Sequence, residues 1–264
     1  LLAVASCVAP CTKTVVGKLA SISDGSDSAQ ERRFFEAPSV VQVRDEFYAA
    51  TGESDYDYVM IGSGYTAHPL NTLVNDRFYA FRDRYISGML DADNDHISEV
   101  VDGYADGSGA GIDNSNLFDA TLSVLNTLDA TKQADGWYYD FTTAGEVGEK
   151  VLSSATSVAG GVTFTTFKPG AATVTNPCEG TLGGATAYNF NILSANAFLN
   201  WDTTNTNINI TDRKLALGGG IPSDVVPVFT KEGVVGIVGI EGGASQLGVL
   251  SGLPRFRTYY YEGG

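Results

Sequence analysis

The stretch that is most informative about the fold is residues 58–83, YVMIGSGYTAHPLNTLVNDRFYAFRD. Its first run, which alternates through Tyr58 and Met60, leads into Gly62-Ser63-Gly64, and glycine allows backbone conformations that are closed to other residues. A second run, residues 77–81, is again apolar and aromatic. Between them Pro69 holds the residue before it extended. The stretch therefore predicts two β-strands around an irregular polar connection.

The rest of the chain also favours β-structure. Of 264 residues 31 are Gly, and Tyr and Phe number 13 each, a mixture typical of short strands joined by tight turns. Other strands are expected at residues 40–43, 57–61, 77–82, 137–141, 148–153, 161–167, 185–192, 225–230, 234–240 and 256–261. Lys231-Glu232-Gly233 is expected to be a hairpin loop. The sequence thus predicts an all-β fold whose strand spacing is that of propeller blades.

The domain organisation follows from changes in composition. Residues 1–33 are small, polar and turn-rich, which predicts a loop-rich lead-in, and residues 34–264 carry the strands. Residues 85–131 form an acidic insert with nine carboxylates and no Lys or Arg. Within it, the leucines of residues 110–130 fit neither a helical stripe nor strict alternation, so a short helix and an edge hairpin both remain open.

A series of peptides resembles, in the same order, motifs of the C-terminal propeller domain of the PilY family, which are surface and tip-associated proteins of bacterial type IV pili. These peptides are residues 32–38 (RRFFEAP), 58–83, 136–140 (GWYYD), 148–152 (GEKVL), 163–169 (TFTTFKP), 176–178 (NPC) and 220–223 (GIPS). The resemblance covers roughly residues 18–262, with 85–131 poorly matched. Motifs in a fixed order are more specific than any single motif.

The resemblance implies a complete or partial (modified) β-propeller of antiparallel blades with an acidic loop insert. It also implies a non-enzymatic protein of the bacterial surface, exported through the periplasm, that supports type IV pilus biogenesis and adhesion. Pilins or minor pilins at the pilus tip are the implied partners, with host or surface ligands beside them. Since family members carry a signal peptide and a long N-terminal region, the chain resembles a C-terminal fragment that begins inside a propeller.

Charge and hydropathy limit the other function classes. The net charge is −15, so the surface repels phosphate backbones and anionic headgroups, and nucleic-acid binding is not expected. No apolar run approaches the roughly 20 residues that span a bilayer. The alternative to a contact protein is a propeller enzyme, either a quinoprotein-like dehydrogenase or a glycan hydrolase. A quinoprotein needs a stacking tryptophan, and the chain has only Trp137 and Trp201.

The metal-ligand candidates lie in the acidic insert and are Asp91, Asp93, Asp95, Ile97 through its carbonyl, Glu99 and Asp102. Their spacing resembles an EF-type calcium loop, although His96 takes the usual glycine position and Asp102 replaces the bidentate glutamate. A solvated acidic loop is the alternative. PilY-family propellers carry a calcium loop before the Arg-Phe-Phe motif, so the resemblance does not assign calcium to these residues.

No catalytic residue is predicted. Ile61 stands where a nucleophile elbow around Ser63 needs glycine, so a tight turn is favoured there. His68 is expected to order its loop through a hydrogen bond. The aromatic runs 137–139 and 259–261 fit both strand packing and a carbohydrate or protein contact. Of the three cysteines, Cys7 and Cys11 could close a small loop, which leaves Cys178 unpaired. The cysteines and the two histidines do not have the spacing of a zinc site.

Overall fold

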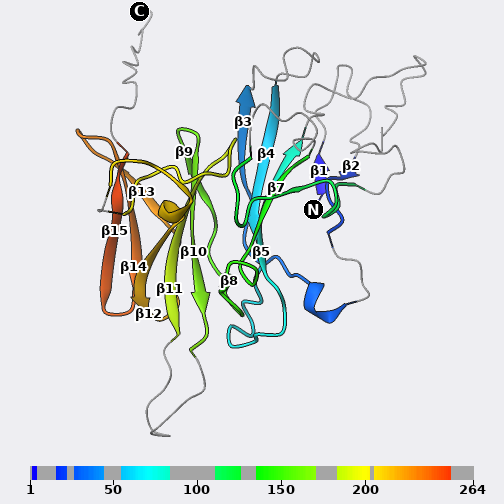
Figure 1. Cartoon of the computed structure of the whole chain (residues 1–264), viewed down its shortest axis with the longest axis horizontal. Helices are drawn as coiled ribbons and strands as arrows, with labels where there is room; N and C mark the ends of the chain where they lie inside the picture. Colours follow the sequence, from blue (N-terminus) through cyan, green and yellow to red (C-terminus); the bar gives the residue numbers. More distant parts are fainter. Residues whose placement is uncertain are drawn as a thin grey trace, which may run out of the picture.

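The computed structural model describes the chain as an all-β protein (Figure 1). It describes residues 2–4, 16–22, 27–44, 55–83, 111–125, 135–170, 183–202 and 205–250. Within these ranges the helical segments are short 3₁₀ turns, η1 (Ser28–Gln30) and η4 (Ile210–Arg213). No helix in the described part is long and apolar enough to cross a membrane.

The first sheet is built on the 58–83 stretch. Its strands, in spatial order, are β3 (Ser39–Arg44), β4 (Asp55–Gly62), β5 (Arg77–Asp83), β7 (Gly136–Asp140) and β6 (Phe118–Asp119). Neighbours are antiparallel except β6 and β7. β4 and β5 pair with Gly62 opposite Phe78, and the interior of β5 is buried on both faces. Two-sided burial explains why Arg77–Asp83 reads as a nearly continuous apolar run.

Two further sheets follow along the chain. The second contains β12 (Lys214–Gly219), β11 (Gly184–Asn191), β10 (Gly161–Lys168) and β8 (Lys150–Val151), with β9 (Thr156–Val158) also on β10. The third contains β13 (Val226–Phe229), β14 (Val234–Ile240) and β15 (Gly243–Leu250). A separate pair near the N-terminus joins β1 (Leu2–Val4) to β2 (Val16–Lys18). All pairs in these sheets are antiparallel.

An aromatic core fills the space between the first and second sheets. The Phe78 and Phe164 rings stack at 3.9 Å between centroids with an interplanar angle of 8°, and Phe164 stacks on Tyr188 at 5.4 Å. Trp137 lies 5.3 Å from Phe190, and its indole N–H donates to the Ile192 carbonyl at 2.8 Å. Offset stacking and tilted contacts are the arrangements that aromatic quadrupoles favour. The aromatic runs of the sequence thus hold the two sheets together.

Segments outside the strands cover the opposite face of the first sheet. Ile61 and Tyr79 on this face pack against Leu19, from the lead-in, and against Ile112, from the 85–131 segment. The backbone joins these two covering segments, because the Ile112 amide donates to the Leu19 carbonyl at 2.9 Å. Residues 111–125 therefore contribute to a hydrophobic core. They contain the two-residue strand β6 and turns, and form neither the short helix nor the hairpin considered from sequence.

The third sheet packs on the second through apolar side chains. Val238 and Leu247 of the third sheet contact Ala187 and Leu217 of the second in a smaller apolar cluster. The three sheets consequently stack face to face, in chain order (Figure 1). This is the face-to-face arrangement of propeller blades, and the described residues do not close a ring.

Most of the expected strands are present. β3, β4, β5, β7, β10, β11, β13 and β14 confirm the predictions over their lengths, and the Thr230 amide closes the β13–β14 hairpin on the Gly233 carbonyl at 2.7 Å. The strand expected at 148–153 shrinks to Lys150–Val151. The short strands β1 and β2 of the lead-in, together with β6, β9, β12 and β15, were not predicted. Residues 256–261 lie outside the described ranges.

The aromatic core makes a direct prediction about stability. Phe164→Ala removes a fully buried ring that touches both sheets, and we expect it to lower the free energy of unfolding by about 3–5 kcal/mol. Phe229→Ala is the matched control, because Phe229 is 76% exposed, and we expect a change within about 0.5 kcal/mol. Guanidinium unfolding followed by circular dichroism measures both. Equal effects would contradict this assignment of the core.

Candidate functional site

The junction between the first two sheets forms where β8 meets the end of β4. The Val151 amide donates to the Ser63 carbonyl at 3.0 Å. A Cβ atom added at Gly64 would lie 2.1 Å from the Val151 carbonyl oxygen, and one at Gly62 would lie 2.3 Å from a Val151 methyl. Neither glycine has a positive φ. The expectation of a turn with unusual backbone angles is therefore wrong: these glycines are needed because another strand passes too close for a side chain.

Ser63 is buried between the two glycines and serves this junction. Its hydroxyl donates to Asp76 Oδ1 at 2.6 Å and accepts from the Arg77 amide at 2.9 Å. The side chain has no exposed surface. The Ser63 hydroxyl thus links the end of β4 to the start of β5 and has no access to a substrate in solution.

Ionisable groups are buried beneath the β4–β5 connection. Burial raises the pKa of Asp76 and lowers the pKa of Lys150, and each lowers the cost of charge on the other. The Lys150 ammonium donates to the carbonyls of Pro69 at 2.9 Å and Gly148 at 2.6 Å. Arg32 donates through Nε to the Asn75 carbonyl at 2.7 Å. Lys150 and Arg32 therefore hold the two halves of the connection in place.

The neighbouring residue Glu149 performs a similar role on the other side of β8. Its carboxylate accepts hydrogen bonds from Thr166 Oγ1 and, at 3.2 Å, from the Tyr188 hydroxyl. Burial raises its pKa. Successive residues of an extended strand point to opposite faces, so Glu149 contacts the second sheet while Lys150 contacts the first.

A group of aromatic and cationic side chains lies on the surface above this junction. The Arg33 guanidinium lies 4.1 Å from the Tyr65 ring centroid, Phe35 stacks on Tyr65 at 5.9 Å and 15°, and the His68 ring meets Tyr65 edge-on at 4.7 Å. We call Arg33, Phe35, Tyr65 and His68 the Tyr65 cluster. His68 was expected to order its loop through a hydrogen bond; its ring instead packs on Tyr65, while its backbone makes the turn hydrogen bonds.

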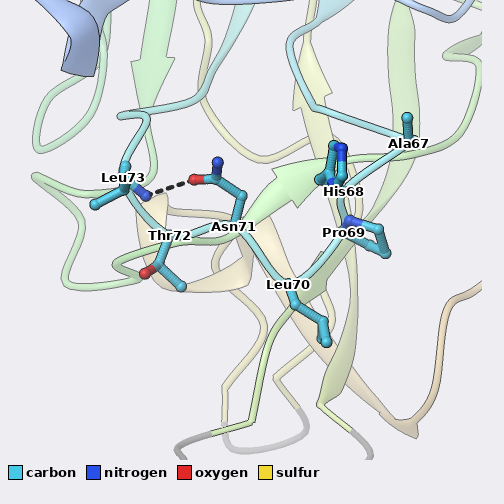
Figure 2. A pocket seen from close by; sticks show the side chains of 7 residues that line it. All are labelled: Ala67, His68, Pro69, Leu70, Asn71, Thr72 and Leu73. Carbon is cyan, nitrogen blue, oxygen red and sulfur yellow. Dashed lines mark hydrogen bonds between the residues drawn. The ribbon is translucent and has the colours of Figure 1, made fainter.

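A shallow hollow adjoins the Tyr65 cluster. Residues 67–73 line it, and its volume is about 540 Å³. Figure 2 shows the side chains of Leu70 and Leu73 projecting away from the turn in different directions, with the Leu73 amide bound to Asn71 Oδ1 at 2.8 Å. Leu70 is 69% exposed and Leu73 is 76% exposed. The connection therefore offers uncovered apolar surface next to the Tyr65 cluster.

The aromatic residues considered as contacts from sequence serve mainly as core. Trp137 is buried, as is Tyr139, whereas Tyr138 is half-buried with the Arg77 guanidinium 4.2 Å from its ring centroid. Trp201 is half-buried and donates from its indole N–H to the Leu247 carbonyl at 2.7 Å. Residues 259–261 lie outside the described part of the chain.

The calcium candidates also lie outside the described residues. These are Asp91, Asp93, Asp95, Ile97, Glu99 and Asp102. Among the residues that the structure does describe, no group of three or more His, Cys, Asp or Glu side chains could hold a metal ion. Calcium binding by the acidic insert stays a prediction. Cys7, Cys11 and Cys178 are likewise not described, so their pairing stays open.

Among known proteins, the chain has similarity to solved structures. No protein-family model matches the chain, and no curated protein matches it in sequence. Among solved structures the chain is similar to the crystal structure of the Pseudomonas aeruginosa PilY1 C-terminal domain, with 14% sequence identity and a TM-score of 0.49. The match covers 84% of this chain and 46% of that chain, so the chain spans less than half of the solved domain.

The close approach at the junction can be tested with two glycine substitutions. Gly64→Ala places a methyl group against the Val151 carbonyl, and we expect it to destabilise the protein by about 1–3 kcal/mol or more, as overpacking does. Gly184→Ala is the matched control, since nothing lies within 4 Å of a Cβ there and its φ is not positive. Thermal unfolding compares the two. A Gly64→Ala protein as stable as the control would contradict the close approach.

Proposed function

We propose that the chain is a contact module of a type IV pilus-associated surface protein, which supports pilus biogenesis and adhesion without catalysing a reaction. The observation that carries the proposal is the arrangement of the peptides that resemble the PilY family. Ile61 and Phe78 come from the peptide 58–83 of that series, whereas Val151 and Phe164 come from two others. All four residues are buried in neighbouring strands. Peptides that resemble motifs of one family, in the same order, thus build one structural unit.

The chemistry of the junction supports contact over catalysis. Ser63, Asp76, Glu149 and Lys150 are the polar groups most shielded from water there, and each has a partner inside the protein. A catalytic group must reach its substrate in at least one state of the reaction. Ser63 and Asp76 instead link β4 to β5, and Glu149 binds within the second sheet. Lys150 joins the second sheet to the β4–β5 connection of the first. Their arrangement is that of a structural support beneath an exposed loop.

The exposed features suit a protein that binds other macromolecules. The sheets form a rigid scaffold, and loops on rigid scaffolds commonly carry binding residues. On the third sheet, Val226 is 56% exposed and Phe229 is 76% exposed, which adds a second apolar surface. On this proposal the partners are pilins or minor pilins, together with host or surface ligands, and the protein acts outside the cell after export through the periplasm.

Fractionation of cells tests this proposal. In the bacterium that encodes the chain, we expect the protein in the sheared surface fraction together with the major pilin. Its amount there should fall sharply in a strain that lacks the major pilin, because the protein would have lost the structure that carries it. Immunoblotting measures the protein, and a periplasmic marker in the same blot controls for lysis. Retention of the protein in the cytoplasm, or an unchanged surface amount without pilin, would contradict the proposal.

A further inference from the structure

Arg33 is an exposed cation whose position is fixed while its hydrogen-bond donors remain available. Its guanidinium lies 4.1 Å from the Tyr65 ring centroid, an arrangement that holds the planar group in place. Within the described ranges its side chain donates no hydrogen bond and forms no ion pair. A guanidinium that stacks by its face still presents its N–H edge to a carboxylate. Arg33 is therefore ready to bind an anionic oxygen pair.

Exposed apolar side chains lie both in the Tyr65 cluster and in the adjoining hollow. Phe35 stacks on the same Tyr65 ring and is 53% exposed. Leu70 and Leu73, in the hollow beside His68, are more exposed still. Exposed aromatic and aliphatic side chains close to an arginine resemble the centre of a protein–protein contact more than an ordinary solvated loop. The ligand should accordingly present apolar side chains as well as a charge.

Internal hydrogen bonds fix both segments that carry this surface. The Gly64 amide donates to the Arg33 carbonyl at 2.8 Å, which ties residues 31–38 to the β4–β5 connection. The Asn75 amide donates to the Ala29 carbonyl at 2.8 Å, and Lys150 holds Pro69 from below. A surface that is ordered before binding loses less conformational entropy when the ligand arrives. The Tyr65 cluster has the rigidity that a binding site needs.

We propose that the Tyr65 cluster and the adjoining hollow bind a peptide segment of a partner protein in which one carboxylate stands beside a bulky apolar side chain. The carboxylate pairs with Arg33, and the apolar side chain packs on Phe35 and on Leu70 or Leu73. This inference rests on the proposed function, since it takes the module to act through contact, and it names the chemistry of one partner.

Charge and surface chemistry favour this ligand over other anions. The chain as a whole has a net charge of −15, so a ligand with many negative charges is repelled at long range. A single carboxylate at Arg33 meets a local positive charge with less of that penalty. Acidic sugars offer a carboxylate but little aliphatic surface for Leu70 and Leu73. A peptide satisfies both the cation and the exposed apolar side chains.

A peptide array tests the inference. The folded protein is applied to immobilised octapeptides of constant Gly-Ser background in which two adjacent positions take every pair of amino acids. We expect the signal to concentrate on pairs that join Asp or Glu to Leu, Ile, Met or Phe. Fluorescence anisotropy measures the affinities of the strongest peptides. We expect the affinity to be about tenfold weaker for Arg33→Gln, and to fall also for Phe35→Ala. Lys231→Gln, which removes a distant exposed cation, should leave binding unchanged.

Several results would overturn the inference. A flat array, binding that Arg33→Gln leaves unchanged while both proteins keep the same melting temperature, or a preference for acidic glycans on a parallel glycan array would each do so. Failure here is distinguishable from failure of the proposed function. A protein that co-fractionates with pili but gives a flat array retains the pilus role and loses only this ligand. A protein that binds the array but never reaches the pilus fraction loses the pilus role.

Discussion

The approach of β8 to the end of β4 is the constraint on which the rest of the structure depends. Because Val151 passes so near Gly62 and Gly64 that no Cβ atom fits, the two sheets meet at one fixed position. That position lets Phe78 stack on Phe164 across the interface. It also sets Lys150 beneath Pro69, where its ammonium holds the exposed connection. Packing between the sheets and presentation of the surface loop therefore have the same physical origin.

Burial of charge at this junction restricts its conformations. A charged group taken out of water is costly unless hydrogen bonds and an opposite charge compensate it. Asp76 and Lys150 compensate each other, whereas Glu149 relies on the hydroxyls of Thr166 and Tyr188. Any rearrangement that separated the sheets would part Lys150 from Asp76 and from the Pro69 carbonyl, and would leave both charges without compensation. The hydrogen bond from Lys150 to Pro69 also holds the loop above these groups in place, as a contact surface requires.

The sequence predicted the fold well where side chains alternate or cluster, and poorly where pairing is set by distant segments. β4 and β5 were predictable because aromatic and β-branched residues fill them. β12 and β15 were not predictable from the sequence, because glycines and small residues weaken the alternation of apolar and polar side chains. These two strands form by pairing with β11 and β14. The glycines of Gly62-Ser63-Gly64 were expected to serve a tight turn, but they are needed for the close approach of Val151, which a local stretch of sequence does not reveal. The Tyr65 cluster joins residues that precede β3 to residues that follow β4, so no local pattern predicts it. The signal in the sequence is limited to two aromatic residues, Phe35 and Tyr65, within the peptides 32–38 and 58–83.

Amide hydrogen exchange at the junction tests the central claim most directly. If β8 is joined to β4 as described, the Val151 amide, which donates to the Ser63 carbonyl, exchanges only in the same global opening as interior amides of β10 such as Phe164. The account predicts equal exchange free energies for Val151 and Phe164, measured residue by residue by NMR. Exchange of Val151 at the rate of an exposed loop amide, while Phe164 stays protected, would contradict it.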